Sequence, residues 1–355
     1  MSGERQTQRG GEGSLQIQVA GDYIVGIDEA RAKEIAIATS QQVIAEYTQE
    51  ALATVQARID ELDTRVIRTL DEKGQLNAFA DPAFQRTVKK AQNSAAATER
   101  ESDYDMLAAL LSDRAGNPRD RMSMAGIDRA IEIVDLVDDE ALRGLTVLHA
   151  VGTWVPASSF LGDGLNALER IFSQLIDGPL PLGNEWAEHL DVLDAVRVGS
   201  IGTMRDYDEL MSSRMDGYTA AGLPTEEVPE FVGGSFPEGY PWSHFVVDHE
   251  LRPGYKRIAT PTMEKLRELM KEQGFQEDAI VEIEGHAKNL FGIGNTEPQV
   301  REAFMTELNS RPALRAVGEW WAQIFTVVQP TTVGKTLATA NAFRLDAEGR
   351  LPREG

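Results

Sequence analysis

The sequence predicts a mainly α-helical protein whose beginning differs in kind from the rest. From Asp28 to about Glu72 there is no glycine or proline, and apolar residues recur every seven positions. Before this run, Leu15 to Val19 alternate apolar with polar residues, which is typical of a half-buried strand. After residue 81, several segments combine helix-start signals with apolar residues at helical spacing. We therefore expect a short β-strand pair, a long coiled-coil-like helix and a multi-helix body with an irregular insert rich in proline and aromatic residues.

Composition limits the classes of function. The chain has 355 residues, of which 42 % are hydrophobic, so it can bury a sizeable core in more than one sub-region. The net charge of -22 disfavours nucleic-acid binding, because phosphate contacts need concentrated Lys and Arg. Cysteine is absent, which excludes disulfides and zinc–thiolate sites. No apolar run is long enough to span a bilayer, and residues 1–13 lack a secretory signal. These features predict a cytoplasmic protein without membrane contacts.

The N-terminal strands need a partner surface. After the first strand, Gly21-Asp22 indicates a turn, and Tyr23 to Val25 indicate a second short strand. Two strands alone are marginal in water, so they pack either on the helical body or on the same element of other chains. The expected segments are a disordered tail over 1–14, strands and long helix over 15–75, a helical domain over 76–215, the insert over 216–261, a C-terminal helical part over 262–345 and a tail over 346–355.

The long helix carries two series of residues seven apart, which we call the seam: Ala45, Leu52, Ile59 and Val66, with Thr48, Val55, Leu62 and Thr69. Such a stripe packs either on the body of its own chain or in a coiled coil between chains. A helix of about 45 residues would be about 65–70 Å long, which exceeds a compact domain and favours self-association. The predicted interface between copies is Leu15, Ile17, Val19, Leu52, Val55, Ile59, Leu62 and Val66.

Local signals place further elements in the body. Asp81-Pro82 and Asp138 or Asp139 start helices, and others are expected near Leu165–Ile176, Glu185–Val196, Thr260–Gly274, Arg311–Phe325 and Thr331–Phe343. Thr296 to Gln299 fit a capping box, and Phe325 to Gln329 a short strand. Within residues 216–261, five prolines stand among aromatic side chains, which indicates an ordered loop region rather than a linker.

The region 240–250 holds the densest group of chemically capable side chains, namely His244, Asp248, His249 and Glu250. Imidazole with carboxylate suits acid–base catalysis or a divalent metal, and on a strand His244 and Asp248 would share one face. No established metal-binding spacing surrounds them, so a polar-edged strand is the competing interpretation. The catalytic candidates are His244, Asp248 and His249, and we expect no bound metal.

Other motifs have structural interpretations. Val333 to Thr336 match the end of a phosphate-binding loop, but the position of its first glycine is occupied by Gln329. We interpret the stretch as a capped terminal helix and expect no cofactor. His149 lies on an apolar helix face and is expected to be a satisfied core residue, whereas His189 is expected at a rim.

Three stretches in order resemble an uncharacterised family of bacterial hypothetical proteins. They are Ile17 to Asp22 with the helix start after Ile27, Phe79 to Gln85 with Leu107 to Arg114, and Val196 to Gly202 with the distant Thr332 to Asn341. The resemblance implies a strand, a long helix and a helical body, and no catalytic residues. The beginning also resembles N-terminal modules of some bacterial defence-associated proteins.

These observations favour a homo-oligomeric, cytosolic interaction or scaffold protein that binds itself, with another protein as a further candidate partner and stress or phage defence as its setting. Enzymatic activity is left open and is the less favoured alternative. It would be that of a hydrolase or metal-dependent enzyme that uses the region 240–250. A phage or prophage structural component is the third alternative.

Overall fold

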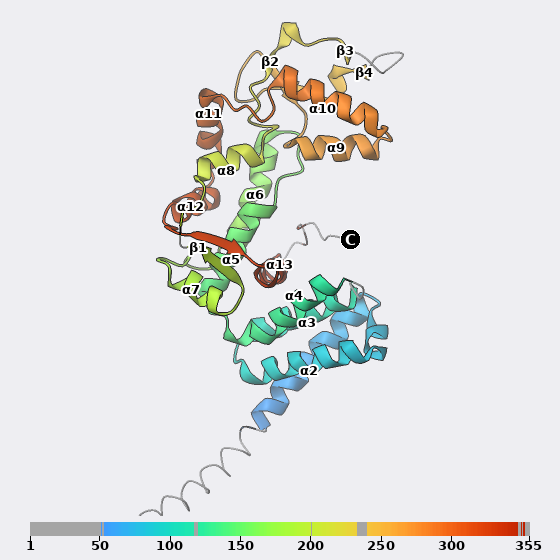
Figure 1. The fold of residues 1–355 in the computed structure, drawn as a ribbon, viewed down its shortest axis with the longest axis vertical. Coiled ribbons are helices and arrows are strands. Elements are labelled where there is room, and N and C mark those ends of the chain that lie inside the picture. The colour runs from blue at the N-terminus through green and yellow to red at the C-terminus, as the bar shows by residue number, and fades with distance from the viewer. Residues whose placement is uncertain are drawn as a thin grey trace, which may run out of the picture. The chain divides into compact units, whose positions relative to one another are not determined.

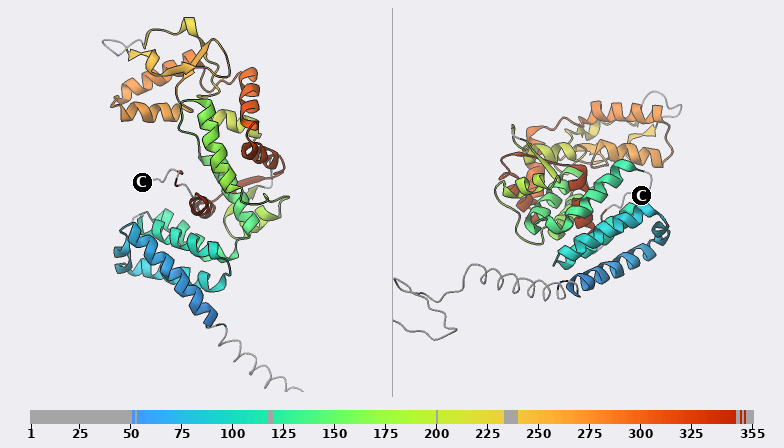
Figure 2. Two further views of the ribbon diagram at one scale, coloured as in Figure 1. Left: turned by 180° about the vertical axis from the view of Figure 1, so that it is seen from behind. Right: turned by 60° about the horizontal axis from the view of Figure 1, so that its bottom comes forward.

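The computed structural model describes residues 51, 53–116, 120–199, 201–232, 240–346, 349 and 351. The chain divides into two compact units, Met1–Thr54 and Val55–Gly355, and the second is described here (Figures 1 and 2). It is mainly helical with a few short antiparallel strands, as the sequence predicts. The predicted strands over 15–25 and the first part of the long helix lie outside the described residues.

The first part of this unit is a group of packed helices. Residues 53–72 are helical and end before Gly74. Asp81 caps the next helix, because its Oδ1 accepts a hydrogen bond of 2.9 Å from the amide of Ala83, and Pro82 follows as its first residue. This confirms the predicted helix start. The elements are η1 (Leu76–Ala80), α2 (Pro82–Ala97), α3 (Glu101–Gly116), α4 (Arg121–Ile133) and η2 (Val134–Leu136).

The next part joins helices to a two-stranded ribbon. Asp138 caps α5 by accepting from two amides of its first turn. The helix expected to reach Val196 ends at Val192, and Val196 begins a strand that pairs with Pro330. The partner strand is 134 residues away in sequence, so a local pattern could not reveal it. The elements are α5 (Asp139–Thr153), α6 (Leu161–Leu175), α7 (Glu185–Val192), β1 (Val196–Gly199) and α8 (Tyr207–Arg214).

The proline- and aromatic-rich insert forms small sheets rather than an irregular loop. Strands β2, β6 and β5 form one antiparallel sheet in that order, and β3 pairs with β4. Their aromatic side chains meet two following helices: the rings of Trp242 and Phe291 lie 5.2 Å apart. The elements are β2 (Leu223–Pro224), η3 (Thr225–Glu227), β3 (Phe231–Val232), β4 (Tyr240–Pro241), η4 (Trp242–His244), β5 (Val246–Asp248), β6 (Tyr255–Ile258), α9 (Met263–Glu272) and α10 (Glu277–Phe291).

Two hydrophobic cores result. The smaller core consists of buried apolar residues between Ala220 and Ile293, so it combines the sheets with α9 and α10 (Figure 1). The predicted boundary at residue 261 therefore falls inside a packed unit. Helix α9 begins at Met263 with Thr262 as its cap, later than expected, because Thr262 Oγ1 accepts from the amide of Lys265.

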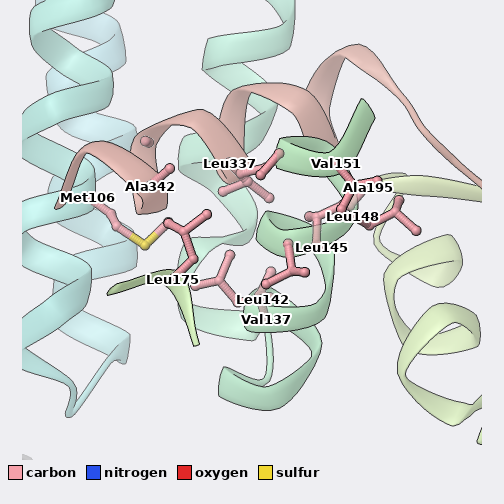
Figure 3. Packing of buried hydrophobic residues seen from close by; sticks show 14 of the residues in the cluster. Met106, Val137, Leu142, Leu145, Leu148, Val151, Leu175, Ala195, Leu337 and Ala342 are labelled. Atoms are coloured by element: carbon pink, nitrogen blue, oxygen red, sulfur yellow. The ribbon is translucent and has the colours of Figure 1, made fainter. Parts of the chain in front are cut away.

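The chain then returns to the larger core, which contains buried apolar residues from Leu62 to Tyr218 and from Phe304 to Leu351. Helix α13 packs against α5, α4 and α3, and Figure 3 shows Leu337 among side chains of α5. The predicted capping box is wrong: Glu297 caps α11 without a side-chain bond, and Thr296 bonds to Thr219 instead. The elements are α11 (Pro298–Asn309), α12 (Pro312–Trp321), β7 (Val327–Pro330) and α13 (Thr332–Leu345).

Candidate functional site

The described part of the seam is progressively buried toward its C-terminal end. Leu62 and Val66 are 0 % and 1 % exposed and belong to the larger core, while Val55 and Ile59 are half-buried. This corrects the predicted interface for Leu62 and Val66, which are covered by their own chain. Heptad spacing identifies an apolar stripe but does not identify what covers it. The predicted interface residues Leu15, Ile17, Val19 and Leu52 lie outside the described residues.

Polar contacts hold this helix on the body. Arg58 donates from Nη1 to the carbonyl of Ala96 at 2.9 Å, at the end of α2. Arg65 donates to Asp105 of α3 at 2.7 Å, and its guanidinium lies 5.5 Å from the ring centre of Tyr104. For the helix from Arg58 onward, the sequence left open whether its apolar stripe packs on the same chain or on another copy. These contacts show that it packs on its own chain.

The three weak catalytic candidates have separate surroundings. His244 lies in the short helical turn η4 rather than on a strand, so the expected period of two does not apply to it. Asp248 is exposed at the end of β5 and pairs with Lys256 at 2.7 Å. His249 is 2 % exposed. The structure therefore places one candidate in the interior and two at the surface, each with different neighbours.

Both ring nitrogens of His249 contact backbone groups. Nε2 lies 2.9 Å from the carbonyl oxygen of Ala220, and Nδ1 lies 3.3 Å from the amide of Leu251. The ring satisfies both contacts when Nε2 donates and Nδ1 accepts, which is the neutral form. Burial is the main cause that lowers the pKa of this imidazole. These contacts give His249 a structural role, because neither nitrogen is left for a metal ion.

An ion pair between a buried arginine and a partly exposed carboxylate lies beside His249. The guanidinium of Arg257 is fully buried and donates to both carboxylate oxygens of Glu250 at 2.7 Å. It also donates to the carbonyl of Ser159 at 2.8 Å, and Glu250 accepts from the amide of Leu161. Strand β6 and the turn after β5 are thereby tied to the start of α6. The sequence pointed to Glu250 but not to Arg257, because their pairing depends on the fold.

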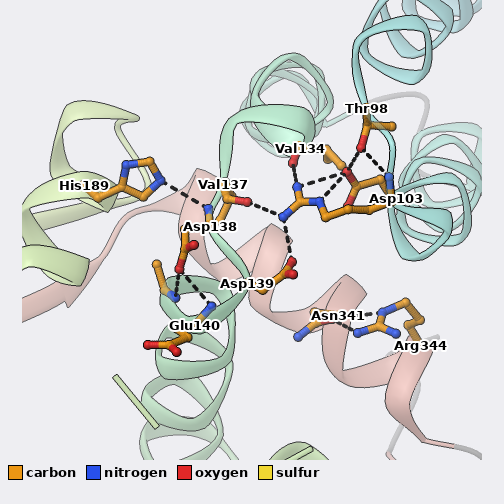
Figure 4. A network of polar contacts seen from close by, with 12 residues as sticks. Thr98, Asp103, Val134, Val137, Asp138, Asp139, Glu140, His189, Asn341 and Arg344 are labelled. Carbon is orange, nitrogen blue, oxygen red and sulfur yellow. Dashed lines mark hydrogen bonds and ion pairs between the residues drawn. The ribbon is translucent and has the colours of Figure 1, made fainter. Parts of the chain in front are cut away.

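A second polar network stabilises the connection from α4 to α5 (Figure 4). Arg100 donates to the carbonyls of Val134 and Val137 and to the carboxylates of Asp103 and Asp139, at 2.6–3.0 Å. Burial raises the pKa of the Asp103 carboxyl, although its bonds to Thr98 and Arg100 act in the opposite direction. The network satisfies carbonyls that the helices leave unpaired, so it is structural.

The other histidines occupy supporting positions. The ring nitrogens of His149 lie 3.2 Å from the hydroxyls of Thr339 and Thr153. Its burial lowers the pKa to about 4, so the ring is neutral at physiological pH. His189 is half-buried and accepts from the amide of Asp138 at 3.2 Å (Figure 4).

The stretch that resembles a phosphate-binding loop starts α13. Thr331 caps this helix by accepting from the amide of Gly334 at 3.2 Å. A Cβ at Gly334 would lie 1.9 Å from the carbonyl oxygen of Ala195, so glycine is required for close packing of the helix on the chain before β1. This agrees with the interpretation as a capped terminal helix.

Within the described residues, no group of three or more His, Asp or Glu side chains is arranged to hold a metal ion. Every helix in that part of the chain is too short or too polar to cross a bilayer.

One protein-family model matches residues 26–349. The chain belongs to this family. The family is uncharacterised, which agrees with the resemblance inferred from the three ordered stretches. No curated protein and no solved structure matches the chain.

Proposed function

We propose that this protein is an interaction or scaffold protein that associates with copies of itself through the segment preceding its helical body. The observation that carries the proposal is the position of the seam relative to the division of the chain at Thr54 and Val55. The seam runs across this division without glycine or proline. Its later positions, Leu62 and Val66, are covered by the body, whereas Ala45, Thr48 and Leu52 precede the division.

The gradient of burial supports this proposal. Leu62 and Val66 are almost fully buried, Val55 and Ile59 are half-buried, and Thr54 is exposed. Among the described residues, the cover supplied by the body thus decreases toward the start of the helix. We infer that the apolar positions before Thr54 are covered by a second copy, which offers the same stripe in a symmetric arrangement. Alanine and threonine in the seam bury little apolar area, so we expect a reversible assembly.

Light scattering on the full chain tests self-association. We expect a mass above that of one chain, which falls toward the monomer in Leu52→Asp, because an unpaired charge in an apolar interface costs several kcal/mol. Thr54→Asp is the matched control, since it introduces the same charge at an exposed position outside the seam. A monomer at every concentration, or equal loss of mass in both variants, would contradict the proposal.

A further inference from the structure

A groove lined by α8, α11 and α12 has no role in the packing described above. It consists of two adjoining surface hollows of about 690 and 740 Å³ that are open to solvent and share Asp208, Asn309 and Arg315. One cavity follows a single stripe of α11 that contains Arg301 and Met305. The other extends along the start of α8 and the end of α12 to Phe325.

Arg301 is the unusual residue of the first cavity. Its Nε atom is shielded from water and has no hydrogen-bond partner. Among the described residues its guanidinium has no ion-pair partner within 4.0 Å. A shielded donor on a cation without a partner is costly, and proteins seldom keep one unless an acceptor comes from outside. Arg301 therefore points to a ligand with an acceptor group.

The opposite wall provides a carboxylate that is also unpaired within the described part of the chain. Asp208 lies in the first turn of α8, and its side chain accepts no bond there from a neighbouring residue. Burial, followed by the nearby carboxylate of Asp206, raises the pKa of Asp208, whereas Arg301 acts in the opposite direction. Arg315 is exposed and reaches Glu319 only at 4.0 Å. The groove thus offers cations and an acceptor to one ligand.

The overall charge of the groove excludes simple attraction of polyanions. Its acidic residues outnumber its basic ones, so recognition must come from paired contacts rather than from a positive field. The arginine fork suits a carboxylate, to which it can donate two parallel hydrogen bonds. The charged residues lining the two cavities are Arg205, Arg301 and Arg315 with Asp206, Asp208, Glu302 and Glu319.

The second cavity adds apolar surface. Trp321 and Met204 contribute to its wall, and Phe325 at its edge is 72 % exposed. Large aromatic side chains that remain exposed beside a cavity are typical of interaction sites. A ligand that follows both cavities therefore meets charged groups first and apolar groups next, which matches an extended chain rather than a compact metabolite.

We propose that this groove binds a peptide segment of a partner protein, with a carboxylate of the segment on Arg301 and Arg315 and an apolar side chain against Phe325. A backbone amide or amino group of the segment donates to Asp208. The carboxylate satisfies the shielded Nε of the half-buried Arg301, and the apolar contact removes Phe325 from water. This inference does not depend on self-association, since all of its residues lie within 203–325.

The test selects binders from a random-peptide library displayed on phage, with the full chain as bait. Enriched peptides should share Asp or Glu next to an apolar residue. Their affinity should fall about 30-fold or more in Arg301→Gln, because the carboxylate loses its charged donor. Arg86→Gln, at an exposed position on α2, should leave the affinity unchanged.

Three outcomes would overturn the proposal: no enrichment, enrichment without a shared carboxylate, or equal binding to Arg301→Gln. Free glutamate that displaces the peptide at equal concentration would instead indicate a small-molecule site. Urea denaturation distinguishes a binding role of Arg301 from a structural one. If Arg301 binds a ligand and has no internal partner, Arg301→Gln should leave the denaturation midpoint unchanged or raise it. A clear drop in the midpoint would make Arg301 structural and also contradict the inference.

Discussion

The two cores of this protein bury their surfaces in different ways. The larger core is built from helices, whose backbone groups bond within each helix. The smaller core is built from strands of two to four residues against two helices, with Trp242, Phe245 and Phe291 at its centre. Short strands leave many carbonyls unpaired, and a buried carbonyl needs a donor.

Several polar side chains bond to carbonyls where the backbone is irregular. Near the smaller core, Tyr218, Arg257 and His249 contact the carbonyls of Ser158, Ser159 and Ala220. In the helical region, the corresponding network at Arg100 lies at the connection from α4 to α5. The comparison teaches that these polar side chains satisfy backbone carbonyls outside the α-helices and strands.

The largest expected effect on stability comes from removing one aromatic ring from each core. Phe304 and Phe291 are both 0 % exposed, so Phe304→Ala and Phe291→Ala should each lower the free energy of unfolding by about 3–5 kcal/mol. Phe160→Ala, at a position 56 % exposed, should change it by about 0.5 kcal/mol or less. Calorimetry decides whether the cores form one cooperative unit. Two separate transitions, each shifted by only one variant, would show that the cores unfold independently.

The next effect concerns the ion pair of the smaller core. Arg257→Met should destabilise the protein by about 2–3 kcal/mol, because Glu250 and the carbonyl of Ser159 lose their donor. Lys256→Gln, which breaks a pair with the exposed Asp248, should cost about 1 kcal/mol or less. Urea denaturation measures both changes. Adding Glu250→Gln to Arg257→Met should restore part of the loss, and a fully additive double variant would contradict direct coupling.

The last effect is a dependence of stability on pH, which develops gradually and is small close to neutral pH. His149 belongs to the helical region and His249 to the smaller core, and burial lowers the pKa of both rings, to about 4 for His149. The unfolded chain therefore binds protons first, and stability present at neutral pH is lost below about pH 6.5, by at most about 1.4 kcal/mol per pH unit for each ring. Denaturation midpoints of His149→Gln should fall less steeply on acidification. An unchanged slope would assign the effect to other groups.

Local signals predicted those elements that depend on residues close together in the sequence. Asp81 and Asp138 were identified as helix starts because a cap bonds to amides two or three positions ahead. Strand β1 was missed, since its partner β7 is far away in sequence. The insert was expected to be irregular because strands of two to four residues are too short to show alternation. Of the candidate site, His249 was noticed, but its structural role depends on Ala220.

By itself, the sequence determined that this protein is mainly helical, where most helices begin, and that mostly apolar residues recur every seven positions between Ala45 and Val66. These properties depend on spacing and on contacts within one helical turn. Only the tertiary structure decided that the body covers Leu62 and Val66, and that, among the described residues, the Nε of Arg301 has no hydrogen-bond partner. Burial and pairing depend on residues brought together from distant segments, and no local pattern records them.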